Sequence, residues 1–141
     1  MVSFVVTNYN KQKSILVTLA SIISVIDVKD ELIFIDDGST DNSLMLAERY
    51  LDENISNYTI IKLVNSGVSN ARNQGIKKAK NEWIFQIDGD DYIRKSEFVQ
   101  VKKCLGKYQC DVIICDFLFA KDSFHKANPN TSKEFIFSLS Q

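Results

Sequence analysis

The feature of this sequence that most limits its fold is a regular alternation of short apolar runs with amphipathic segments. The apolar runs predict strands at residues 2–6, 31–35, 59–64, 83–87 and 111–119. Apolar residues at three- and four-residue steps predict helices at about 14–25 and at 68–79. Two further helices are predicted, one that follows the polar turn at residues 36–41 and ends near residue 51, and one at about 95–105. This order favours a three-layer α/β sandwich, in which helices cover both faces of a mainly parallel sheet.

The helix predicted at residues 68–79 carries unusually small residues on the face expected to be buried. That face would hold Val68, Ala71, Gly75 and Ile76. Because alanine and glycine project little or nothing from the backbone, we expect this helix to approach the sheet closely.

Length and charge limit the number of domains and the kinds of partner. A chain of 141 residues can sustain one hydrophobic core. Its net charge of -1 provides no general attraction to nucleic acid, and no apolar run approaches the roughly 20 residues that cross a bilayer. The three cysteines lack CxxC spacing and the chain shows no apolar leader, so we expect a cytoplasmic location. Any association with the inner face of the membrane would be made by parts outside this chain.

Polar clusters follow three of the predicted strands directly. They cover residues 7–10, 36–41 and 88–91. Ligands of parallel α/β sheets gather at the carboxyl ends of the strands, so we expect the three clusters to share one edge of the sheet and to form a binding site there.

The sequence Asp88-Gly89-Asp90 is the strongest single indication of chemistry. In an extended segment Asp88 and Asp90 would point the same way and could address one cation. Mg²⁺ and Mn²⁺ prefer oxygen ligands, and two carboxylates with substrate phosphates suffice to hold Mg²⁺. Acidic residues also favour the start of a helix, but three carboxylates within four residues repel one another unless a cation is present.

Two other groups at the same edge could contact a nucleotide. Asp36 and Asp37 offer acceptors for base or ribose donors, although neighbouring residues 39–41 also suit helix capping. Arg72, about one turn into a predicted helix, could meet a phosphate or pair with an aspartate of the site.

With these blocks, the chain resembles the inverting family-2 glycosyltransferases, whose nucleotide-binding domain has the Rossmann-like GT-A fold. The resemblance runs in order through residues 2–10, 35–41, 65–75 and 88–91. One departure is Thr7-Asn8, which stands where the family often has proline followed by an apolar residue.

The resemblance implies a role for each matched residue. Thr7 and Tyr9 would contact the nucleobase, Asp37 would accept a hydrogen bond from the base with Asp36 beside it, and Arg72 would hold the base or phosphate region. Asp88 would lie near the ribose and the metal. Asp90 would be the principal ligand of a Mn²⁺ or Mg²⁺ cofactor.

The activity that the resemblance implies is transfer of a sugar, with inversion, from a nucleoside-diphosphate sugar to a hydroxyl of a carbohydrate or lipid-linked acceptor, and a UDP-sugar is the donor that we expect. Bacterial polysaccharide or glycoconjugate synthesis is the expected setting. Residues 1–120 would form the donor-binding domain and 121–141 the start of a truncated acceptor-side region, so no catalytic base is assigned.

Three other classes of function are alternatives to this interpretation. A dinucleotide-dependent dehydrogenase is disfavoured because none of the five glycines forms a GxG turn. An aspartyl phosphohydrolase could use Asp88 and Asp90, although the motif follows the fourth strand instead of the first. A nucleotide-binding fragment without catalytic activity stays open as the non-enzymatic alternative.

Overall fold

The computed structural model describes residues 1–105, 107, 111–114 and 135–137. The chain divides into two compact units, residues 1–99 and residues 100–141. The first unit contains, in order, β1 (Val2–Asn8), α1 (Ile15–Ile23), β2 (Glu31–Asp36), α2 (Ser43–Asn54), β3 (Tyr58–Lys62), α3 (Val68–Lys78), β4 (Trp83–Asp88) and the first half of α4 (Lys95–Cys104). The predicted alternation of strands and helices is confirmed over this unit.

The four strands of the first unit form one parallel sheet in the order β3-β2-β1-β4. β1 is central, and its last residues pair with the last residues of β2 and β4: Asn8 lies opposite Asp36, and Thr7 lies opposite Asp88. The chain reverses its direction of travel across the sheet between β1 and β4, which is where ligands bind in open α/β sheets. The three predicted polar clusters therefore meet at one edge.

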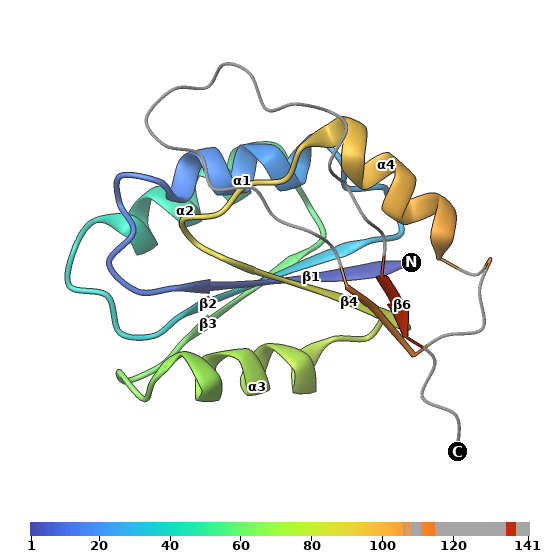
Figure 1. The fold of residues 1–141 in the computed structure, drawn as a ribbon. Coiled ribbons are helices and arrows are strands. Elements are labelled where there is room, and N and C mark those ends of the chain that lie inside the picture. Colours follow the sequence, from blue (N-terminus) through green and yellow to red (C-terminus); the bar gives the residue numbers. More distant parts are fainter. Residues whose placement is uncertain (106, 108–110, 115–134, 138–141) are drawn as a thin grey trace. The chain divides into compact units, whose positions relative to one another are not determined.

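Helices cover both faces of this sheet, as predicted. Figure 1 shows α1 and α2 on one face and α3 on the other. Val5, Ile33 and Ile35 of the sheet are fully buried against Ala71 of α3. Full burial of each such side chain contributes about 1.5–3 kcal/mol, so the sheet is held from both sides.

The close approach of α3 to the sheet is confirmed, but only part of its predicted face is buried. A Cβ atom at Gly75 would lie 2.3 Å from Cγ1 of Val5, so this position tolerates no side chain without movement. Val68 and Ile76, expected on the buried face, are 48% and 38% exposed. The difference arises because α3 packs on β1 and β2 along a narrow face, whose buried residues are Ala71 and Gly75.

An aromatic cluster joins the opposite face of the sheet to the start of α4. The ring centroid of Phe98 lies 5.4 Å from that of Phe4 and 4.9 Å from that of Phe85, the latter in an edge-to-face arrangement. Such ring pairs add about 0.5–1.5 kcal/mol beyond area burial. They fix the segment that follows Asp88, and so fix the chain on both sides of the acidic turn.

The second unit differs from the predicted fifth parallel strand. β5 (Val112–Ile114) pairs with β6 (Phe135–Phe137) in an antiparallel two-stranded sheet. The three residues of β6 supply the partner for β5. Local periodicity does not specify the partner of a strand. The predicted domain boundary at residue 120 lies outside the described residues.

None of the helices in the described parts of the chain has the length and apolar character that a membrane crossing requires.

Candidate active site

A cavity of about 310 Å³ opens at the carboxyl edge of the sheet. It lies between the end of β1, the loop after β2, the start of α3 and the end of β4. Its lining contains Thr7, Asn8, Tyr9, Lys11, Asp37, Asn65, Gly67, Val68, Ala71, Asp88 and Asp90. Five of the residues predicted from the sequence, Thr7, Tyr9, Asp37, Asp88 and Asp90, are thus brought together from three separate segments.

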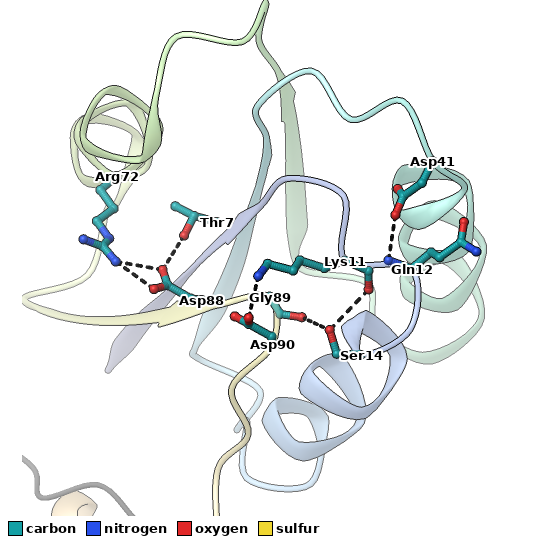
Figure 2. Close-up of polar contacts among 9 residues, drawn as sticks. All are labelled: Thr7, Lys11, Gln12, Ser14, Asp41, Arg72, Asp88, Gly89 and Asp90. Atoms are coloured by element: carbon teal, nitrogen blue, oxygen red, sulfur yellow. Dashed lines mark hydrogen bonds and ion pairs between the residues drawn. The ribbon is translucent and has the colours of Figure 1, made fainter. Parts of the chain in front are cut away.

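Asp88, the last residue of β4, is held by two neighbours (Figure 2). The hydroxyl of Thr7 donates to Oδ1 of Asp88 at 2.7 Å, and Nη2 of Arg72 donates to both carboxylate oxygens at 2.9 and 2.8 Å. Partial burial alone would raise the pKa of Asp88, but these hydrogen bonds and the positive charge of Arg72 outweigh it and lower the pKa below its ordinary value. Asp88 is therefore an oriented, ionised carboxylate.

Asp90 lies beyond the strand, in a turn. β4 ends at Asp88, and Gly89-Asp90 turn away, so the extended alternation predicted to align the two aspartates stops one residue too early. The turn is held by the Gly89 N–H, which donates to Thr7 O at 2.8 Å, and by the Ser14 hydroxyl, which donates to Gly89 O at 3.0 Å. Asp88 and Asp90 still line the same cavity, but the turn brings Asp90 there.

The carboxylate of Asp90 contacts the ammonium group of Lys11, which reaches it from the loop after β1 (Figure 2). The side chains of Lys11 and Asp90 are 35% and 49% exposed. Each aspartate of the pair thus has its own basic partner, Arg72 for Asp88 and Lys11 for Asp90. The neighbouring Asp91 has a raised pKa, because of partial burial first and the charges of Asp90 and Asp88 next.

Asp37 lines the cavity, but its carboxylate is already occupied. Oδ1 accepts the backbone N–H and the hydroxyl of Ser66 at 2.8 and 3.0 Å, and Oδ2 accepts the Gly67 N–H at 2.8 Å. The side chain therefore ties the loop after β2 to the start of α3.

Asp36 is 2% exposed and is not among the residues that line the cavity. Its Oδ1 accepts from Asn8 at 2.7 Å and from the Ser39 hydroxyl at 2.6 Å, while Oδ2 accepts the Ser39 N–H at 3.0 Å. The structure thus gives Asp36 a part in holding the loop after β2. Residues 39–41 were expected to cap the next helix, but the N-cap of α2 is Asn42, which makes no side-chain cap hydrogen bond; Asp41, one residue earlier, accepts the Ser43 N–H at 2.9 Å.

Asn8 connects the segments on either side of it. Its Nδ2 donates to Asp36, Ser39 and Ser43 at 2.7–3.0 Å, whereas its buried Oδ1 has no hydrogen-bond partner among the described residues. That oxygen lies 3.1 Å from the position of a Cβ atom at Gly89, and Thr7 O lies at the same distance. Gly89 therefore permits a close approach between the acidic turn and the end of β1.

The donor chemistry of the cavity fits a hard divalent cation. Within the described part of the chain, no group of three or more Asp, Glu, His or Cys side chains could hold a metal. Two carboxylates with phosphate and water oxygens nevertheless suffice for Mg²⁺. Three carboxylates and one ammonium group line the cavity, so it favours a cation and repels a diphosphate unless a cation accompanies it.

Sequence reasoning missed Lys11 and Ser14, and it placed Asn8 in the polar cluster at residues 7–10 without giving it a role of its own. The polar run at the end of the first strand continues into Lys11. A basic residue expected on the same sheet edge as two aspartates is the signal that could have identified Lys11. Asn8 and Ser14 act through partners that are far away in the chain, at positions 36 and 89, which no local pattern indicates.

The chain is similar to known sequences over most of its length. The model of the family described as glycosyl transferase family 2 matches residues 3–140. The uncharacterized glycosyltransferase EpsJ of Bacillus subtilis is 32% identical over 117 residues, which cover 83% of this chain and 34% of that protein. Poly-beta-1,6-N-acetyl-D-glucosamine synthase of Staphylococcus epidermidis is 33% identical over 92 residues, covering 65% and 22%. The chain spans about a third or less of these relatives.

Solved structures of TarS from S. aureus resemble the fold. The complex of TarS 1–349 with UDP-GlcNAc has a TM-score of 0.68 and 27% sequence identity, and the match covers 75% of this chain and 31% of that chain. The complex with UDP has a TM-score of 0.67 and 28% identity, over 75% and 32%. This similarity confirms the GT-A arrangement predicted from the sequence.

Proposed function

The chain belongs to glycosyl transferase family 2, and from this membership we propose that it forms the donor-binding part of an enzyme that transfers a sugar from a UDP-sugar to an acceptor hydroxyl. The observation that carries the proposal is the cavity at the end of β1 and β4, where Asp88 and Asp90 converge opposite the start of α3. A helix start and two carboxylates at one sheet edge suit a ligand that bears both a base and a metal-bound diphosphate.

The choice of a uridine nucleotide rests on the relatives. TarS, whose structures contain UDP-GlcNAc and UDP, shares 27–28% of its residues with this chain over the matched region. Tyr9, 43% exposed at the cavity, offers a ring against which a base could lie, and Thr7, two residues earlier, lines the same cavity.

Asp88 and Asp90 are the residues that would hold a divalent cation. A bound Mn²⁺ or Mg²⁺ would neutralise the charge that develops on the leaving diphosphate. Arg72 and Thr7 keep the Asp88 carboxylate ionised and fixed in direction, because they donate three hydrogen bonds to it. The Gly89 N–H bond to Thr7 holds the turn, and with it Asp90, at the end of the sheet.

The reaction proposed for the whole enzyme is a direct displacement with inversion. The acceptor oxygen forms a bond to the anomeric carbon, the bond from that carbon to the diphosphate oxygen breaks, and the acceptor proton passes to a base. This chain would contribute charged groups that are fixed in position around the diphosphate. Such groups lower the barrier because they stabilise the charge that develops there in the transition state. The base is left unassigned.

Calorimetric titration of the chain with UDP, with and without Mn²⁺, tests the donor and metal parts of the proposal. We expect Mn²⁺ to tighten binding by at least about tenfold, which corresponds to about 1.4 kcal/mol. Asp90→Asn should remove this dependence, because it replaces a charged ligand by a neutral one of the same shape. Equal affinity with and without Mn²⁺ would contradict the proposed metal site.

A matched control removes one negative charge elsewhere. Glu53 lies on α2 in an exposed ion pair with Arg49. Glu53→Gln should therefore leave the UDP affinity unchanged both with and without Mn²⁺. Titration with GDP and ADP in the same buffer tests the base. If these bind as tightly as UDP, the uridine assignment fails even where the metal dependence holds.

A further inference from the structure

Asp90, an aspartate proposed to bind a metal, contacts the ammonium group of Lys11. Among the described residues, Lys11 is the basic partner of Asp90, whereas Asp88 is shared by Thr7 and Arg72. Arg72 donates a rigid guanidinium to both oxygens of its partner, while Lys11 presents a single ammonium group on a flexible stem. The pair at Asp90 is therefore the easier one to exchange.

The backbone of Lys11 is fixed, although its charged end can move. Its carbonyl oxygen accepts the N–H groups of Ser14 and Ile15 at 3.0 and 2.9 Å, at the start of α1. Its Cγ lies 3.3 Å from the Cβ position of Gly89, so the stem crosses the acidic turn. The fixed backbone and stem thus tether the ammonium group near the cavity when it leaves Asp90.

A divalent cation and the ammonium group compete for Asp90. Two positive groups within a few ångströms repel each other, so binding of the cation at Asp90 favours departure of Lys11. The displaced ammonium group stays tethered at the mouth of a cavity proposed to take a diphosphate. Phosphate oxygens are strong acceptors for such a group.

We propose that Lys11 is an exchangeable counter-ion: it occupies Asp90 before the divalent cation binds and then transfers to the diphosphate of the donor. This inference rests on the proposed function of the site. Lys11 opposes binding of the metal alone and supports binding of the metal together with the nucleotide. It therefore couples the two binding events, and the coupling is reciprocal.

Mn²⁺ and UDP binding to Lys11→Met test the proposal. Bound Mn²⁺ is measured by the loss of the electron paramagnetic resonance signal of the free ion, without nucleotide, and UDP affinity is measured by calorimetry at saturating Mn²⁺. We expect Mn²⁺ alone to bind about fivefold tighter in the variant, the scale of an exposed ion pair. We expect UDP to bind about tenfold more weakly, because a charged donor to phosphate is lost.

Lys13→Met is the matched control, because it removes the same charge two residues along on an exposed side chain. It should leave both constants unchanged. A purely structural role of Lys11 would weaken both constants together, and that result overturns the proposal, as does a variant with wild-type Mn²⁺ affinity. If the wild-type chain binds UDP independently of Mn²⁺, the proposed metal site fails and this inference fails with it; if wild type shows the metal dependence and Lys11→Met leaves both constants unchanged, only the counter-ion role fails.

Discussion

Replacing Gly89 with alanine should separate the position of the acidic turn from the stability of the fold. The new Cβ atom would lie 3.1 Å from Asn8 Oδ1 and from Thr7 O, and 3.3 Å from Lys11 Cγ. Ordinary van der Waals contact begins near 3.4 Å, so the shortfall is a few tenths of an ångström. Thr7 pairs with strands on both sides and cannot retreat, so the turn must move.

That movement is small for the fold and large for a metal site. Strain of this size costs about 1 kcal/mol of unfolding free energy, at the low end of overpacking effects. Metal–ligand distances tolerate only about 0.2 Å, and the turn carries Asp90. We therefore expect the melting temperature to fall by a few degrees, while the increase in UDP affinity that Mn²⁺ produces falls by about tenfold.

Circular dichroism melting and calorimetric titration with UDP and Mn²⁺ measure the two quantities. Gly75→Ala is the matched control, because its Cβ would meet Val5 Cγ1 at 2.3 Å and Ile35 Cδ1 at 2.8 Å in the core and has no residue of the acidic turn among its nearest neighbours. It should lose about 1–3 kcal/mol of stability and keep its Mn²⁺ dependence. Wild-type Mn²⁺-dependent affinity in Gly89→Ala would refute the claim that this close approach sets the position of Asp90.

Three further predictions concern single side chains. Arg72→Met should lower stability at neutral pH by up to about 1 kcal/mol, and the difference from wild type should vanish as pH falls below about 3.8, because the depressed pKa of Asp88 stabilises the fold only while Asp88 is ionised. Denaturant melts at several pH values measure this. Asn8→Ala should cost about 1–3 kcal/mol in the same melts, since buried Asp36 loses a donor. Phe98→Ala should cost about 3–5 kcal/mol, and a smaller loss would contradict its packing between two rings.

Periodicity was sufficient to predict the order of strands and helices in residues 1–99 and the close packing of Ala71 and Gly75. Both follow from which residues share a face, and local spacing determines this. Spacing does not tell whether a neighbour covers that face. Val68 and Ile76 are partly exposed for this reason, and the apolar run at 112–114 pairs with β6 instead of extending the parallel sheet.

The sequence was sufficient to predict that the polar clusters converge at one edge of the sheet, but not which side chains contact one another there. Thr7, Asp37, Asp88 and Asp90 reach one cavity because parallel strands end at one edge. Whether a carboxylate oxygen of the site already accepts a hydrogen bond depends on donors that are distant in the chain. The partners of Asp37 at Ser66 and Gly67 could not be identified from the sequence alone.

The measurement that tests the central claim most directly is a crystal of this chain grown with Mn²⁺ and UDP, with anomalous scattering recorded at the manganese edge. The account predicts one manganese peak in the cavity, about 2.0–2.3 Å from a carboxylate oxygen of Asp90 or Asp88 and in contact with the diphosphate. UDP bound in the cavity with no manganese peak at either aspartate would contradict it.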